Sequence, residues 1–428
     1  MPALDGIRVL DLSRILAGPW CTQLLADFGA DVVKVEKPGG GDDTRRWGPP
    51  WLKDGGGADS DESAYFLACN RGKRSVAIDF TRPEGQALVA RLAQRADVLV
   101  ENFKVGGLAP YGLDFETLRR DNPRLVYCSI TGFGQTGPYA QRAGYDAAIQ
   151  AMGGLMSITG EPDGHPGGGP QKVGVAVADL VAGLYAASAI LAALHHRDRT
   201  GEGQHLDVAL LDTQVAMLAN QASNFLVGGL LPGRIGSAHP NIVPYRVFAS
   251  ADGHLMLAVG NDAQFARFAR IAGHPEWAAD ARFATNPARV HHRDTLEPQV
   301  AAALAQRGTA AWLAALEAAG VPAAPINDIA QVFADPQVLA RGLRVEAEHA
   351  CGGRVAMVRQ PVRFSATPAQ APRAPPACGQ HAAGVLAEIG VTAPELAALR
   401  AAGVVGGVAE EKTGSRGGAE RQRRGEDS

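Results

Sequence analysis

The fold is decided by residues 7–36, IRVLDLSRILAGPWCTQLLADFGADVVKVE. Two runs rich in Val, Ile and Leu, at 7–12 and 31–36, predict β-strands that are buried on both faces. The segment between them, 19–28, has the length and apolar spacing of a short helix. A strand, a helix and a second strand in this order form a crossover unit whose strands are parallel. These residues therefore predict the first part of a parallel sheet.

The same alternation continues as far as residue 130. The further strand-like and helix-like runs are, in order, Arg74–Asp79, Pro83–Arg95, Asp97–Glu101, Phe115–Asn122 and Arg124–Ile130. Apolar strands that alternate with short helices are typical of an α/β fold with helices on both faces of the sheet. We therefore predict a Rossmann-like large domain, whose ligands bind at the carboxyl ends of its strands.

A segment rich in Gly and Pro, residues 228–244, separates two parts of the chain. Before it we expect an Ala-rich helix, a strand and another helix, at 175–196, 205–210 and 212–226. After it, the turn Asp252-Gly253 predicts a hairpin, which three helices follow. The runs concerned are Tyr245–Ser250, His254–Val259, Ala263–Ala272, His292–Ala305 and Thr309–Ala319. These elements predict a small α+β domain.

Composition excludes several classes of function. Apolar residues make up 46% of the 428 residues, the net charge is −3, and no long basic run occurs, which argues against nucleic acid as a partner. The five cysteines are scattered, so we expect free thiols in a reducing compartment. The chain shows no secretory or transit segment, and we expect a cytoplasmic protein. The apolar window 173–194 contains Asp179, whose charge is costly in lipid, so a buried helix is expected there rather than a membrane span.

Several common catalytic motifs do not occur in the sequence. The first turn after the first strand, residues 13–19, lacks the GxGxxG pattern of dinucleotide sites, and no phosphate-binding GxxxxGK[ST] occurs. No GxSxG or HExxH is found. The pairs His195-His196 and His291-His292 are adjacent residues, which point to different helix faces. We therefore expect no metal site and no permanently bound cofactor.

Eight short segments, in this order and at these spacings, carry a resemblance to a known family. They are Leu4–Leu12 with Ala17-Gly18-Pro19, Gly29–Glu36, Asn70–Ser75, Asp97–Phe103, Gly132–Pro138, Ala143–Asp146, Val177-Ala178-Asp179 and Gly379-Gln380-His381. The span from Leu4 to about Val404 resembles the class III CoA-transferases. Residues 41–50 and 242–245 are most similar to the succinate–hydroxymethylglutarate (glutarate) CoA-transferase group.

The resemblance implies a domain arrangement. In this family two protomers interlock as a homodimer, and each has a Rossmann-like large domain built from both chain ends. We accordingly predict a large domain at 1–228, a linker and small domain at 229–326, and a return to the large domain at 327–404, which includes a strand at 354–364. The remainder, 405–428, is rich in Gly, Glu and Arg without periodicity and is expected to be disordered.

The resemblance also implies a reaction and a nucleophile. CoA would move from an acyl-CoA, here succinyl-CoA, to a free dicarboxylic acid through intermediates on Asp179. A carboxylate that is ionised at neutral pH needs no general base, and the start of a helix favours negative charge. From the residues alone, an N-terminal capping or buried paired carboxylate remains the alternative for Asp179.

Twelve residues are predicted to bind CoA. Nine match positions that line the family's CoA site, and three form a basic cluster near it in sequence. They are Arg14, Ile15, Ala17, Lys37, Asn102, Phe103, Lys104, Tyr111 and Tyr145, with Arg71, Lys73 and Arg74 as the cluster. Cationic side chains at strand ends suit the phosphates of CoA. A solvated surface charge is the alternative for each Arg or Lys.

Four residues are predicted to contact the acyl group or the acceptor acid. Leu16 stands where formyl-CoA transferase has a polar Gln, and residues 236–240 replace that enzyme's run of glycines, so oxalate and formate are poor candidates. Arg46 is the first candidate to hold the distal carboxylate of a diacid, because an Arg–carboxylate pair can be bidentate. His239 is the second candidate, and Trp47 lies beside Arg46 in sequence.

Two other functions are kept as alternatives. Racemases of this family, which act on 2-methylacyl-CoA, have His in an Ala-Gly-His-Asp motif, where this chain has Tyr145. A tyrosine with a pKa of about 10 is a poor base for removing an alpha proton. A non-catalytic CoA-binding protein is the third possibility, but it would gain nothing from a carboxylate at position 179.

Overall fold

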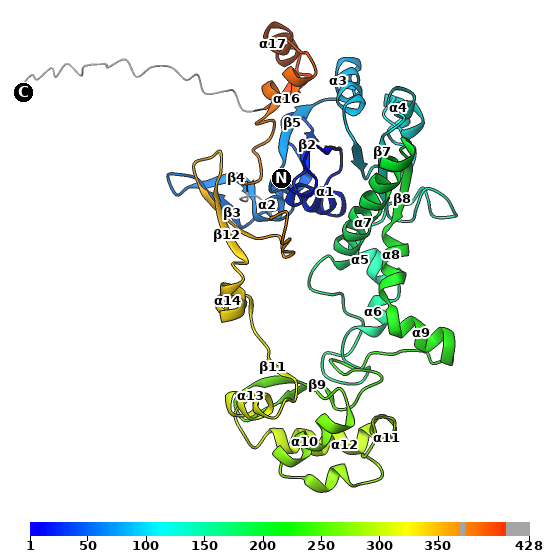
Figure 1. The fold of residues 1–428 in the computed structure, drawn as a ribbon, viewed down its shortest axis with the longest axis vertical. Coiled ribbons are helices and arrows are strands. Elements are labelled where there is room, and N and C mark those ends of the chain that lie inside the picture. The colour runs from blue at the N-terminus through cyan, green and yellow to red at the C-terminus, as the bar shows by residue number, and fades with distance from the viewer. Residues whose placement is uncertain (369–372, 408–428) are drawn as a thin grey trace, which may run out of the picture.

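The computed structural model describes residues 1–368 and 373–407, and Figure 1 shows two lobes. The large lobe is built on a seven-stranded sheet in the order β14-β5-β2-β1-β6-β7-β8. From one edge to the other its strands are Val405–Gly406, Arg74–Ile78, Asp31–Glu36, Arg8–Asp11, Val98–Glu101, Val126–Thr131 and His205–Ala209. The strand runs predicted from the sequence are all present. The sheet is parallel except for β14, which pairs antiparallel with β5.

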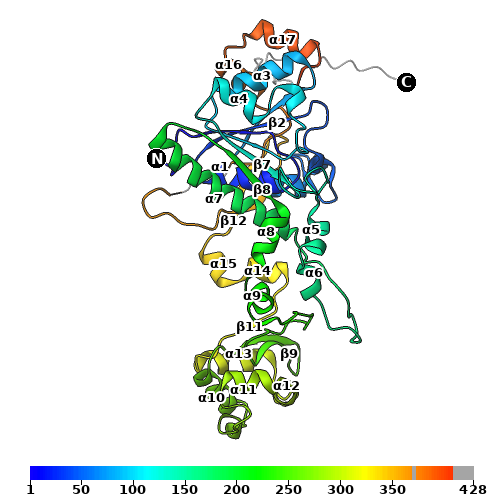
Figure 2. The same cartoon turned by 90° about the vertical axis from the view of Figure 1, so that its right-hand side faces the viewer.

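Helices cover both faces of the sheet, as the alternating pattern predicts (Figures 1 and 2). One face packs on α3 (Pro83–Gln94), α4 (Phe115–Asp121), α16 (Ala382–Glu388) and α17 (Ala393–Ala401). The other packs on α1 (Ala17–Asp27), α7 (Val177–Thr200) and α8 (Leu210–Met217). Successive residues of β1 enter the two cores, Val9 on the α7 side and Leu10 on the α3 side. This explains why the strands have apolar residues without alternation.

The small lobe is an antiparallel sheet with helices on it. Its strands are β9 (Tyr245–Ala249), β10 (His254–Ala258) and β11 (Ala323–Pro325), and its helices are α10 (Asp262–Ile271), α11 (Asn286–His291), α12 (Arg293–Leu304) and α13 (Thr309–Ala318). The hairpin predicted around Asp252-Gly253 is confirmed as β9–β10. Phe265, Phe268 and Trp312 are buried in its core.

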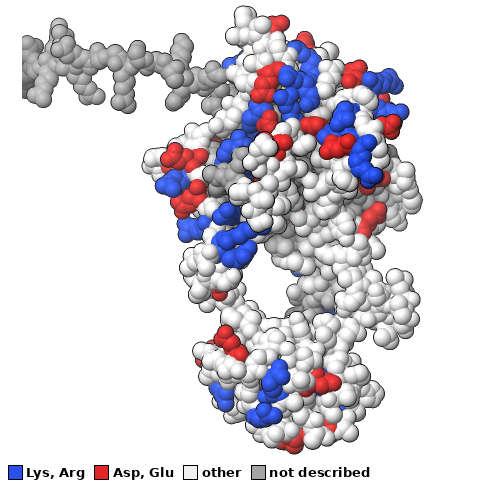
Figure 3. Space-filling model, viewed as in Figure 1, with Lys and Arg blue, Asp and Glu red and all other residues white. Residues whose placement is uncertain are grey.

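Short elements join the lobes and flank the sheet. They are β3 (Trp51–Lys53), β4 (Asp59–Ser63), α2 (Ala64–Ala68), α5 (Asp146–Met152), α6 (Leu155–Ile158), α9 (Ala219–Gly228), α14 (Ile329–Ala334), α15 (Pro336–Ala340), β12 (Arg344–Glu348) and β13 (Arg354–Val358), with single turns at Asp43–Arg46, Ala109–Tyr111 and Pro275–Ala278. Two connections run between the lobes, and Figure 3 shows an opening between them.

Three predicted boundaries were wrong. The helix expected at 212–226 is broken into α8 and α9, because Ala219 has a positive φ of 46°. The strand expected at 354–364 ends at Val358, where its pairing with β12 ends. The tail was expected to begin at 405, but Val405 and Gly406 pair with β5 as a short edge strand. Residues 408–428 lie outside the described part of the chain, and the prediction of disorder there stays a prediction.

The long helix α7 has the length and composition of a membrane-crossing helix, with a hydropathy of 1.9. It packs instead along α1, and a Cβ built at Gly183 would lie 2.7 Å from the carbonyl oxygen of Ala17. Only glycine permits helices to approach this closely at that point. Within its apolar window 44% of the residues are buried, and Leu184 and Tyr185 remain exposed on its other side.

Candidate active site

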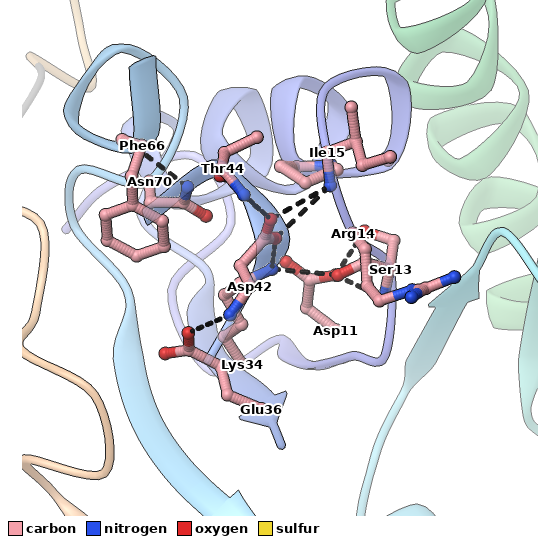
Figure 4. A network of polar contacts seen from close by, with 12 residues as sticks. Asp11, Ser13, Arg14, Ile15, Lys34, Glu36, Asp42, Thr44, Phe66 and Asn70 are labelled. Atoms are coloured by element: carbon pink, nitrogen blue, oxygen red, sulfur yellow. Dashed lines mark hydrogen bonds and ion pairs between the residues drawn. The ribbon is translucent and has the colours of Figure 1, made fainter. Parts of the chain in front are cut away.

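A buried network of charges fixes the carboxyl ends of the central strands (Figure 4). The Asp11 carboxylate pairs with Lys73 Nζ at 3.0 Å and accepts a hydrogen bond from Thr22. The Lys34 ammonium pairs with Asp42 at 2.9 Å and donates to the carbonyl oxygen of Ser13. Burial raises the pKa of Asp11, but Lys73 and Lys34 outweigh it and hold that pKa at about 2. The Asp11 carboxylate therefore stays ionised at neutral pH.

The network shapes the loop that follows β1. Both Asp42 carboxylate oxygens accept the backbone N–H of Ile15 at 3.2 Å, and Ile15 has a positive φ of 71°. The Asn102 side chain accepts from the N–H of Arg14 at 2.8 Å and donates to its carbonyl oxygen at 2.7 Å. Because β-branched residues avoid positive φ, this backbone is held in place by its partners.

A cleft of about 710 Å³ opens at the carboxyl ends of β1, β2 and β5. Its lining combines cations, carboxylates and aromatic rings, and includes Arg14, Lys37, Asp42, Asp79, Phe80 and Phe103. The Arg14 guanidinium lies 5.1 Å from the Phe103 ring centre. The ring of Phe80 packs edge-on against Phe103 and Tyr111. Cations suit phosphates and aromatic rings suit a nucleobase, so the residues present fit CoA as a ligand.

Residues 15–17 connect the wall of the cleft to α7, and the N–H of Ile15 donates to Asp42 of the cleft lining. Leu16 and Ala17 are buried where α1 begins, and the Ala17 carbonyl lies against Gly183 in the second turn of α7. Residues 15–17 therefore lie between the cleft and the second turn of α7, and their contact with the substrate stays a prediction. Lys104 is exposed just beyond Phe103.

Asp179 lies in the first turn of α7 and is partly buried. The N-cap is Ala176, so Asp179 does not cap its helix. Within residues 1–368 and 373–407, its carboxylate has neither a salt bridge nor a protein hydrogen-bond donor. Burial, followed by the charge of Asp146, raises its pKa from 3.8 to about 7. A carboxylate with no structural partner and a perturbed pKa is typical of a functional group.

One aromatic residue, Tyr65, lies close to Asp179, and Trp47 packs behind it. Burial and the nearby Asp179 carboxylate raise the pKa of Tyr65 to about 12, so its hydroxyl keeps its proton. The Trp47 ring packs edge-on against Tyr65, with 5.1 Å between the ring centres. Tyr145 is 66% exposed, directly before Asp146, whose carboxylate accepts from the N–H of Ala178. Trp47 and Tyr145 were predicted from the sequence, but Tyr65 and Asp146 were not assigned roles.

The comparisons with known proteins agree on one family. The family model described as CoA-transferase family III matches residues 4–382. The succinate–glutarate CoA-transferase of Agrobacterium fabrum is 56% identical over 91% of this chain and 96% of its own. The human succinyl-CoA:glutarate CoA-transferase is 44% identical over 90% of this chain and 86% of its own. A solved CAIB/BAIF family protein from Brucella suis is 51% identical and has a TM-score of 0.79. The match covers 91% of this chain and 99% of that protein. This chain belongs to CoA-transferase family III.

The basic cluster of this CoA-transferase has internal partners. The Arg71 guanidinium forms two hydrogen bonds with Asp27, and Lys73 is fully buried against Asp11. Arg74 pairs with Asp31 and Glu388 at the amino end of β5. The cleft lies at the other end of the strands. None of the three side chains lines the cleft, and their contact with CoA stays a prediction.

The two candidates for the distal carboxylate lie elsewhere. The Arg46 guanidinium lies against Gly40 and lines a second cavity of about 1500 Å³, whose lining includes neither Tyr65 nor Asp179. His239 packs on Tyr245, and its carbonyl oxygen accepts from Arg293. The contacts of a single chain therefore bring neither residue to Asp179, and their roles stay predictions. No group of His, Cys, Asp and Glu in the described residues is arranged to hold a metal ion.

Proposed function

We propose that this CoA-transferase moves CoA from succinyl-CoA to a second dicarboxylic acid, with glutarate as the first acceptor to test. Among the described residues the carboxylate of Asp179 has no protein partner and its pKa is raised to about 7, and this observation carries the proposal. The names of the relatives at 56% and 44% identity support the choice of substrates. No observation favours the racemase or the non-catalytic binder.

The reaction would proceed through two kinds of intermediate on Asp179. Its carboxylate attacks the succinyl thioester carbonyl, the C–S bond breaks, and the electron pair leaves on the CoA thiolate. The thiolate then attacks the aspartyl carbonyl of the anhydride, which forms an aspartyl-CoA thioester and releases succinate. The acceptor carboxylate attacks this thioester and displaces the thiolate. The thiolate finally attacks the acceptor acyl carbon, which frees Asp179 and gives the new acyl-CoA.

Substrate choice is tested by an exchange panel. Succinyl-CoA is incubated with glutarate, hydroxymethylglutarate, malate, itaconate, oxalate and acetate, and the new thioesters are identified by mass spectrometry. We expect transfer to one or more longer diacids and poor transfer to oxalate and acetate. Deuterium exchange at an alpha carbon without acyl transfer, or binding of CoA without any transfer, would contradict the proposal.

The pH dependence of the first half-reaction should follow Asp179. Only the ionised carboxylate attacks, and the raised pKa of about 7 means that the ionised fraction grows as pH rises through 7. The single-turnover rate with succinyl-CoA should rise about tenfold per pH unit below 7 and level off above it. Rapid-quench measurements from pH 5 to 9 check this. A rate independent of pH down to 5 would show that Asp179 has an ordinary pKa in the free enzyme.

Arg14 should affect binding of the acyl-CoA more than the chemistry. Its guanidinium lines the cleft, and its exposed ion pair with Asp43 leaves it free to contact a phosphate. Arg14→Ala should raise the KM for succinyl-CoA about tenfold with kcat within about twofold, the loss expected for one charge-assisted contact. Arg119→Ala, which removes an exposed arginine on α4, is the matched control. Equal KM values for both variants would place the phosphates elsewhere.

We also propose that the enzyme is a homodimer. Large apolar side chains are exposed on α9 and in the segment after it, which borders the opening between the lobes (Figures 1 and 3). They are Phe225, Leu226, Val227, Leu230 and Leu231. Exposed apolar groups of this size are typical of a subunit interface. Light scattering should give twice the mass of one chain, and a monomer at micromolar concentration would contradict this.

A cytoplasmic location remains a proposal as well. The five cysteines, which all lie in the described part of the chain, form no disulfide, as expected in a reducing compartment. Cell fractionation tests this proposal, and recovery of the protein from an oxidising compartment would contradict it.

A further inference from the structure

Asp146, the first residue of α5, connects to the helix that carries the proposed nucleophile. Its Oδ1 accepts the backbone N–H of Ala178 at 2.9 Å, in the first turn of α7. Its Oδ2 accepts from Gln150 Nε2 at 2.8 Å, and Gln150 Oε1 accepts the N–H of Val173 at 2.9 Å. The two side chains therefore hold both the first turn of α7 and the segment that precedes it.

The position of Asp146 is itself fixed by the sheet. The backbone just before it runs against the end of β7, where a Cβ built at Gly132 would lie 2.5 Å from the Cα of Gly144. Any larger residue at either glycine would force these segments apart. Gln150, the other hydrogen-bond partner of Asp146, is fully buried, so its side chain is also held in place. The carboxylate of Asp146 is therefore rigidly placed between β7 and the nucleophile helix.

We propose that Asp146 is a positioning residue for the reaction of Asp179: its carboxylate fixes the first turn of α7, and its negative charge makes the ionised nucleophile more reactive. The inference rests on the proposed function, because it assigns Asp146 a part in the attack on the thioester. It does not require Asp146 to contact the substrate.

The electrostatic part of the proposal follows from what surrounds Asp179. The titratable groups that face it are Asp146 from α5 and the neutral Tyr65 from α2, while α1 presents Ala17 and Trp20 to the same stretch of α7. Burial and Asp146 both raise the pKa of Asp179, so the charged form is held at higher free energy. Attack converts this carboxylate into a neutral acyl group. The repulsion is therefore relieved as the anhydride forms, which favours the forward step.

Two variants of the full-length enzyme separate charge from hydrogen bonding. Asp146→Asn keeps an oxygen that can accept from Ala178 but loses the negative charge and the hydrogen bond from Gln150. Gln150→Ala loses that hydrogen bond and the one from Val173 but keeps the Asp146 charge, so it serves as the matched control. For each protein, carbodiimide labelling of Asp179 is followed against pH without substrate. The single-turnover rate with succinyl-CoA is then measured at a pH where Asp179 is ionised in all three proteins.

In Asp146→Asn the labelling midpoint should fall by about one pH unit, and the plateau acylation rate should fall about fivefold or more. In Gln150→Ala the midpoint should stay where it is in the wild type. An unchanged midpoint in Asp146→Asn, or equal shifts in both variants, would overturn the proposal. If Asp146→Asn does not fold, a wild-type midpoint below pH 5 would overturn it instead. If the wild type transfers CoA to no acid, the proposed function fails, while the labelling still decides the effect of Asp146 on Asp179.

Discussion

The Asp179→Asn enzyme should lose CoA transfer by more than about 10³-fold while keeping its fold, because an amide cannot form the acyl anhydride. Both half-reactions pass through this carboxylate, so the loss should appear in kcat for every donor and acceptor. Binding of CoA, measured by calorimetry, should change little, because the cleft lies apart from the first turn of α7. Asp198→Asn, on the same helix at an exposed position, is the matched control.

The same variant should be more stable than the wild type at alkaline pH. The pKa of Asp179 is about 7 in the folded protein and near its ordinary value of 3.8 in the unfolded chain. The folded state therefore binds the proton more tightly, and its stability falls as pH rises from about 4 to about 7. Asn has no charge to bury, so Asp179→Asn should gain about 1–2 kcal/mol above pH 7, after allowance for partial exposure, and little at pH 4. Urea unfolding at the two pH values measures this, and a variant less stable than the wild type at both would contradict it.

The second large effect concerns stability. Lys73→Met should lower the free energy of unfolding by about 3–5 kcal/mol, because it leaves the buried Asp11 carboxylate without its nearest cation. Lys73 also donates to Asn70 and to the carbonyl oxygen of Pro19, and methionine can replace neither bond. The pKa of Asp11, now held at about 2 by Lys73 and Lys34, should rise in the variant.

The matched control is Lys53→Met, which breaks the exposed pair with Asp59 on the β3–β4 hairpin. Exposed pairs contribute about 0–1 kcal/mol, so this variant should unfold at nearly the wild-type urea concentration. Both variants are compared by circular dichroism in urea. A Lys73→Met protein that unfolds together with the control would show that the Asp11–Lys73 pair contributes little to the fold.

Much of the large lobe could be predicted because its signals are local. The strands at 7–12 and 31–36 are continuous apolar runs, and burial on both faces produces this pattern directly. The hairpin at residues 51–63 was missed, because its second strand, Asp59–Ser63, is acidic and polar and lacks an apolar alternation. The edge strand at Val405 was missed because two residues carry no periodicity.

A residue type that implies a chemistry can be noticed in the sequence, whereas a role that depends on distant partners cannot. Asp179 was noticed as a charge in an apolar helix, and its carboxylate has no partner among residues 1–368 and 373–407. The charges of Arg71, Lys73 and Arg74 are neutralised by carboxylates 44, 62 and 43 residues away in the chain. Nothing in the local sequence shows those pairs. Tyr65 lies on a five-residue helix whose approach to α7 also depends on the tertiary fold.

Asp179 should carry first the acyl group and then CoA, and trapping of these intermediates checks this. The wild-type enzyme is incubated with succinyl-CoA, treated with borohydride or hydroxylamine, digested and analysed by peptide mass spectrometry. The modification should lie on Asp179, should require succinyl-CoA, and should not form in Asp179→Asn. Modification of another residue, or continued CoA transfer by Asp179→Asn at the wild-type rate, would contradict it.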